Sequence, residues 1–83
     1  MRRWRGRATR GVGENAVWTL AKGASEYRAA FCQRNASEWE LRLRRDGMLV
    51  MAWLYQSLQT AHIDAGTLKR HLETRGWNAV MRG

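Results

Sequence analysis

The side chains that most often carry out chemistry in proteins are few and scattered in this sequence. His62 and His71 lie nine residues apart, and no Cys, Asp or Glu near them has the spacing of a zinc site. The single cysteine, Cys32, has no base beside it and falls in an apolar segment, where cysteine usually serves as a small core residue. Glu38 and Glu40 could share one strand face, as paired hydrolase carboxylates do, but we expect that face to lie in water. We therefore predict that the chain is not an enzyme and that it uses no metal, no cofactor and no small-molecule substrate.

Basic and aromatic side chains offer a second kind of chemistry. Arg42 and Arg44 alternate with apolar residues in one segment, and the next segment, after a tight turn, contains Trp53 and Tyr55. Surfaces that hold single-stranded nucleic acid combine basic groups for the phosphates with aromatic rings on which the bases stack. If the two segments pair as strands, these four residues could form such a platform, and we predict them as binding residues.

The first ten residues are rich in arginine. Of the formal net charge of +8, five positive charges come from this segment, whereas from residue 11 onward ten basic residues oppose seven acidic ones. A disordered basic segment can follow phosphates and bind nucleic acid with salt-dependent affinity. Because residues 1–13 hold one large apolar residue and no periodicity, we predict a disordered basic arm there and a single domain over residues 14–83. The predicted phosphate contacts are Arg2, Arg3, Arg5, Arg7 and Arg10.

Length and cysteine content limit the class of protein. A chain of 83 residues allows one domain with a small core, in which five tryptophans could supply much of the apolar surface. One cysteine cannot form an internal disulfide, which favours a reducing compartment, and we predict a cytoplasmic protein. No apolar run approaches the length of a membrane-spanning helix, so we predict no membrane association.

Four segments have the composition or the alternation of β-strands. Residues 38–44 alternate most clearly, with apolar residues on one face and charged residues on the other. The pair Asp46-Gly47 then supplies the chemistry of a hairpin turn, and residues 48–55 return as an apolar partner strand. Residues 16–22 and 26–33 have the composition of two earlier strands, separated by turn residues. Together with one C-terminal helix, they predict an α+β fold, a four-stranded antiparallel meander packed by that helix (ββββα).

The helix is predicted to begin after Ser57, whose hydroxyl can accept a hydrogen bond from the free N–H groups of the first turn. It should end at Gly76 in the left-handed conformation, with Trp77 packing back on Leu72. Gly66 lies inside the helix, where glycine costs about 1 kcal/mol relative to alanine. It either lets the helix approach the sheet closely or has no structural role, and the sequence favours neither. The apolar face of the helix consists of Leu58, Ala61, Ala65, Leu68 and Leu72.

Residues 48–55 contain no polar group except the tyrosine hydroxyl, although one helix covers only one side of a sheet. With a two-residue loop at Asp46-Gly47, the open face carries Leu49, Met51, Trp53 and Tyr55. With a three-residue loop that begins at Arg45, it carries Met48, Val50, Ala52 and Leu54. We favour the second register, because it leaves the smaller side chains of Val50 and Ala52 outside. In either register an apolar row containing Val50 or Met51 is exposed, and such rows often mark interfaces.

Three short motifs lie along the predicted domain, each occurring once. They are WTL at residues 18–20, a tryptophan-containing hairpin around a DG turn at residues 38–55, and a final LK..LE.RGW pattern over residues 68–77. In these motifs the chain resembles a group of small uncharacterised bacterial proteins, often from phage-derived or other mobile DNA. The resemblance spans about residues 16–77. It implies the same small α+β domain, but no activity and no site residues.

These observations predict a small non-enzymatic binding module. The first hypothesis is that it binds nucleic acid or a nucleoprotein through the basic arm and the open sheet face. The alternative is a protein–protein interaction module that forms a homodimer through the apolar face of residues 48–55. The first kind of binding should depend on salt, and the second on protein concentration.

Overall fold

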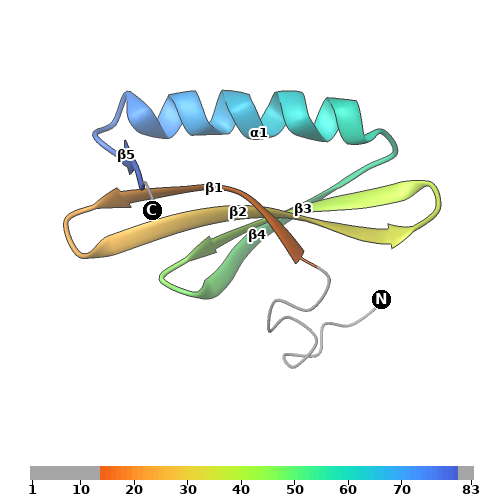
Figure 1. Ribbon diagram of the computed structural model, residues 1–83, viewed down its shortest axis with the longest axis horizontal. Helices are drawn as coiled ribbons and strands as arrows, with labels where there is room; N and C mark the ends of the chain where they lie inside the picture. The colour runs from red at the N-terminus through yellow and green to blue at the C-terminus, as the bar shows by residue number, and fades with distance from the viewer. Residues whose placement is uncertain (1–13, 81–83) are drawn as a thin grey trace.

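The structure is a computed structural model that describes residues 14–80, so the predicted arm at residues 1–13 lies outside it. The elements are β1 (Glu14–Lys22), β2 (Ser25–Asn35), β3 (Glu38–Arg45), β4 (Met48–Tyr55), α1 (Leu58–Glu73) and β5 (Asn78–Ala79). The strands form one antiparallel sheet in the order β4-β3-β2-β1-β5 (Figure 1). The predicted four-stranded meander followed by one helix is therefore confirmed, and the short β5 is an addition to it.

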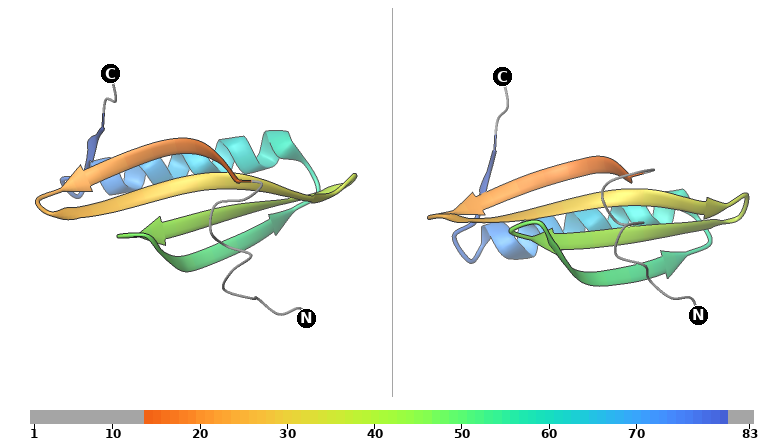
Figure 2. Two further views of the ribbon diagram at one scale, coloured as in Figure 1. Left: turned by 60° about the horizontal axis from the view of Figure 1, so that its bottom comes forward. Right: turned by 90° about the horizontal axis from the view of Figure 1, so that it is seen from below.

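The helix α1 lies along one face of the sheet (Figure 1, Figure 2). As predicted, the apolar positions of the helix point toward the strands. In the middle of the helix, the carbonyl of Ala65 accepts a hydrogen bond from Trp18 Nε1 at 2.9 Å. A second, smaller cluster at the end of the helix joins Leu20, Leu72 and Trp77. The main core between the two layers consists of Ala29, Phe31, Leu41, Leu43, Ala61 and Ala65.

The turn between β3 and β4 is the two-residue loop Asp46-Gly47. Both residues have positive φ, 52° and 87°, as a type I′ turn requires. Arg45 therefore pairs with Met48 across the turn, and the three-residue loop favoured from the sequence is wrong. The turn is held against the neighbouring strand, because the Asp46 amide donates to the carbonyl of Glu26 at 2.8 Å.

Most side chains of β4 nevertheless lie on the faces that the three-residue loop predicted for them. The ladder slips by one residue at Val50, so that Leu43 pairs with Met51. This bulge places the row that contains Trp53 on the same side as the main core. Leu49 lies before the bulge and pairs with Arg44, so it lies on the face opposite the main core. Neither of the two predicted registers places Leu49 on one face and Met51 on the other.

Both ends of α1 are closed as predicted. The Ser57 hydroxyl accepts a hydrogen bond from the Thr60 amide at 3.3 Å. Gly76 has a φ of 99°, and the Trp77 amide donates to the Leu72 carbonyl at 3.2 Å, which closes the last turn. These two caps fix the length of the helix over the sheet.

Candidate functional site

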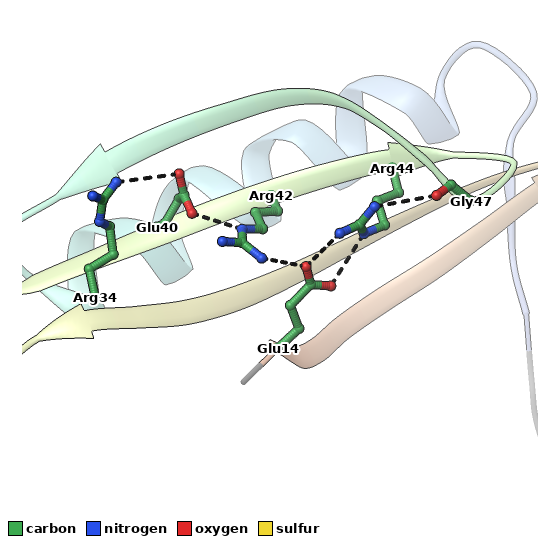
Figure 3. Close-up of polar contacts among 6 residues, drawn as sticks. All are labelled: Glu14, Arg34, Glu40, Arg42, Arg44 and Gly47. Carbon is green, nitrogen blue, oxygen red and sulfur yellow. Dashed lines mark hydrogen bonds and ion pairs between the residues drawn. The ribbon is translucent and has the colours of Figure 1, made fainter. Parts of the chain in front are cut away.

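A row of charged side chains crosses the sheet face opposite α1 (Figure 3). Glu14 on β1 accepts hydrogen bonds from Arg42 Nη1 at 2.7 Å and from Arg44 Nη2 at 2.8 Å, both on β3. Arg42 Nε also donates to Glu40 Oε1 at 2.7 Å, and Arg34 Nη1 lies 3.9 Å from the other oxygen of Glu40. We call these five residues the charged row. It ties β1 to β3 across the intervening β2.

Most of the charged row is buried, although the Arg34 side chain at one end is 41% exposed. The expectation that this face lies in water is therefore wrong for the middle of the row. The side chains of Glu14 and Glu40 are 5% exposed and that of Arg42 is 8% exposed. Burial raises the pKa of Glu14, but hydrogen bonds from Arg44 and Arg42 and their positive charges outweigh burial and lower this pKa below its ordinary value. Burial lowers the pKa of Arg42, and its hydrogen bonds to Glu14 and Glu40 raise it above the ordinary value. The arrangement therefore stabilises both groups in their ionised forms.

The predicted platform of basic and aromatic residues is divided between the two faces. Arg42 and Arg44 belong to the charged row, whereas Trp53 and Tyr55 lie on the helix side and pack against the main core. The Tyr55 hydroxyl donates to Asp64 Oδ2 on α1 at 2.8 Å. Burial and this carboxylate raise the pKa of Tyr55 to about 12. No single face of the described sheet presents all four residues together.

The predicted phosphate contacts of the arm cannot be placed beside this surface. Arg2, Arg3, Arg5, Arg7 and Arg10 all lie outside the described residues. The nucleic-acid hypothesis therefore rests on their sequence, without a contribution from a platform on the sheet.

The strand β4 forms one edge of the sheet (Figure 2). It exposes several large apolar side chains. Val50 and Met51, both predicted as binding residues, are 49% and 54% exposed. Met48 and Leu54, which were not among them, are 71% and 57% exposed. Leu54 pairs with Glu40 and so lies on the side of the charged row, whereas Met51 lies on the helix side. Both faces of β4 are therefore open and apolar.

The other edge of the sheet is built differently. There β5 covers part of β1, with Leu20 and Ala21 paired to Ala79 and Asn78. The rest of β1 contains a bulge at Val17. Short edge strands, bulges and charged residues are devices that prevent a sheet edge from pairing with another chain. In contrast, β4 has eight residues without charge or proline, and its bulge lies near its start.

The other residues considered for chemistry have structural surroundings. The ring of His62 meets Phe31 edge-on, with ring centroids 4.6 Å apart. Cys32 is half-buried and pairs with Glu14 and Glu40 in the ladders beneath the charged row. Within residues 14–80, no group of three or more His, Cys, Asp or Glu side chains is arranged to hold a metal ion. In the same part of the chain, no helix has the length and apolarity needed to cross a membrane.

Comparisons with known proteins identify no relative: no protein-family model, no curated protein and no solved structure matches this chain. The resemblance to small bacterial proteins of mobile DNA therefore stays a prediction. Function has to be argued from the geometry of β4 and of the charged row.

Proposed function

We propose that this protein is a non-enzymatic interaction module that associates with a second copy of itself through β4. The observation that supports the proposal most directly is an eight-residue edge strand that is uncharged and exposes apolar side chains on both faces. Contiguous exposed apolar surface of this kind is typical of interfaces. An edge strand also offers a row of unpaired backbone N–H and C=O groups, which a second strand can satisfy.

The size of this surface sets the expected affinity. Apolar burial contributes about 25 cal/mol per Å² removed from water, so a patch of a few hundred Å² gives several kcal/mol before the costs of association. Interfaces below about 1,200 Å² in total are mostly weak and transient. We therefore expect a reversible dimer with a micromolar dissociation constant.

Nucleic-acid binding is the second candidate, and the composition of the arm supports it. Five of the fifteen basic residues lie in the first ten positions, whereas residues 14–80 hold nine basic and seven acidic residues. The arginines of the charged row already face carboxylates. Affinity for a polyanion should therefore reside in the arm, and deletion of residues 1–10 should remove most of it.

Sedimentation velocity of the full chain tests the proposal. The unmodified protein should shift from monomer toward dimer between about 1 and 100 µM, with little dependence on salt. Leu54→Asp should keep it monomeric, because each copy would place a carboxylate in the apolar surface. Ile63→Asp is the matched control, since Ile63 is 60% exposed, close to the 57% of Leu54, and belongs to α1 instead of β4.

Two results would decide against self-association. One is a protein that stays monomeric at about 100 µM, and the other is an equal loss of dimer in Leu54→Asp and Ile63→Asp. A monomer that forms a salt-sensitive complex with a mixed oligonucleotide would instead support the second candidate.

A further inference from the structure

We infer that two copies join edge to edge through β4, forming one continuous antiparallel sheet with both helices on the same side and with Trp53 opposite its own copy. This inference rests on the proposed function, because it specifies the geometry of that self-association. The competing geometry packs two copies face to face through one apolar row. That arrangement would cover one face of β4 and leave the other face and the edge open.

Symmetry limits how two identical β4 edges can pair. A two-fold axis perpendicular to the sheet reverses the direction of the strand and keeps each face on its own side, so the pair is antiparallel and both helices lie on one side. Residues directly opposite each other in a ladder share a face, and successive residues of a strand alternate between faces. Paired positions must therefore differ by an even number. It follows that one residue lies on the axis, opposite its own copy.

The bulge in β4 selects that residue. The pairing of β4 with β3 is regular from Met51 to Tyr55, and the slip in the ladder occurs just before, at Val50. Because a bulge bends its strand and interrupts pairing, residues 51–55 are the segment that two copies can share. The centre of this segment is Trp53. The axis is therefore expected to pass beside Trp53.

This register brings apolar side chains together on both faces. On the helix side, Met51 lies opposite Tyr55 of the second copy, and sulfur–aromatic contacts of this kind are favourable. The two Trp53 rings become neighbours across the axis. On the side of the charged row, the exposed Leu54 lies opposite Ala52, so a large side chain faces a small one. Each exposed side chain of the segment gains an apolar neighbour.

The local charges fit a second copy as the partner, despite the net positive charge of the chain. β4 itself carries no charge. On the face of the charged row, Arg42 and Arg44 pair with residues of β4, and both contact Glu14. Two β4 edges can therefore approach without placing like charges opposite each other. A partner strand with charged side chains would instead place them against apolar residues, away from water. The edge is thus complementary to itself.

Disulfide trapping tests the register with two mild substitutions. In a Cys32→Ser background, Ala52→Cys and Leu54→Cys proteins are incubated with oxidised glutathione, separately and mixed. The inferred register places position 52 opposite position 54 of the second copy, with about 4.5–5.5 Å between Cβ atoms, and separates each position from its own copy by about 7–8 Å. The mixture should form a disulfide-linked dimer at least about tenfold faster than either protein alone.

Every other result of the trapping experiment overturns the inference. Fast linkage of either protein alone would put the axis at another residue, and equal rates in all samples would indicate no defined register. If sedimentation shows dimers in which no linkage forms, edge pairing fails while the proposed self-association stands. If the unmodified protein is monomeric at about 100 µM, both fail.

Amide hydrogen exchange gives a second readout without any substitution. Edge pairing would hydrogen-bond the outward amides of residues 51–55, so their exchange should slow at least about fivefold between 1 and 100 µM protein, while α1 is unaffected. Face-to-face packing leaves these amides without a backbone partner. Exchange that is independent of concentration in a protein that does dimerise would therefore contradict edge pairing.

Discussion

Leu41 and Arg42 are neighbours in β3 and are almost equally buried, at 1% and 7% exposed, yet they belong to two differently built faces of one sheet. Leu41 packs under α1 with Phe31 and Ala65. Arg42 lies on the other face between two carboxylates that come from different strands. The middle of the sheet is therefore enclosed on both sides, by apolar packing on one and by ion pairs on the other. At β4, in contrast, large apolar side chains are exposed on both faces of the sheet.

The two kinds of burial have different consequences. Apolar burial stabilises the fold directly, by about 1.5–3 kcal/mol for a leucine side chain. A buried ion pair contributes little net free energy, because desolvation of the charges offsets most of their attraction. Its geometric effect is larger: Glu14 reaches across β2 to arginines two strands away. We therefore expect the core to supply stability and the charged row to set how β1 lies relative to β3.

The largest expected effect is on the helix side. Leu41→Ala removes a fully buried side chain from the main core and leaves a cavity, so it should lower the free energy of unfolding by about 2–5 kcal/mol. Leu54→Ala is the matched control in the next strand, where the leucine is exposed and the change should be less than about 0.5 kcal/mol. Urea unfolding followed by circular dichroism measures both. Equal losses in the two variants would contradict this assignment of the core.

On the opposite face, Arg42→Met should lower the free energy of unfolding by about 2–3 kcal/mol, because the buried carboxylates of Glu14 and Glu40 each lose a partner. Glu14 keeps Arg44, and Glu40 keeps Arg34, but each has lost its shorter contact to Arg42. Adding Glu14→Gln removes one of these two under-compensated carboxylates and should recover part of the loss. The same unfolding experiment measures the single and the double variant. If Arg42→Met is as stable as the unmodified protein, this face does not depend on its ion pairs.

A smaller effect should appear as a dependence on pH. The pKa of Glu14 is lower in the folded chain than its ordinary value of 4.5, so its ionised form stabilises the fold above that value. This stability is lost as pH falls through the lowered pKa. The difference in unfolding free energy between the unmodified protein and Glu14→Gln should therefore shrink between about pH 6 and pH 3. A difference that stays constant over this range would show that the Glu14 charge does not contribute.

Features that act between neighbours in sequence were predicted well. The alternation in β3, the position of the hairpin turn at Asp46-Gly47 and the caps at Ser57 and Gly76 each depend on a few adjacent residues, and the structure contains all of them. The favoured length of the turn was wrong. The bulges at Val17 and Val50 were not predicted, because a bulge depends on how two strands fit together across the ladder. The register of β4 could not be derived without them.

The candidate site was predicted in part for the same reason. The apolar composition of residues 48–55 identified the strand, but alternation allowed only one of Val50 and Met51 to be exposed, and both are. The helix leaves Met51 exposed because β4 lies at the edge of the sheet. Glu14 was missed, because nothing in β3 indicates which residue of another strand lies beside Arg42. A buried cation shows that a counterion is needed, and only the topology identifies it.

The smallest expected effect concerns Gly66 on α1 and has the opposite sign. A Cβ at this position would meet only Arg70 Nη1, at 3.8 Å, so the helix does not need glycine to approach the sheet. Gly66→Ala should therefore raise the free energy of unfolding by about 0.5–1 kcal/mol. Gly76→Ala is the counterpart, because its φ of 99° is unfavourable for alanine, and it should cost about 1 kcal/mol. Thermal unfolding compares the two. A loss of stability in Gly66→Ala would mean that the helix side of the sheet is packed more tightly than its contacts indicate.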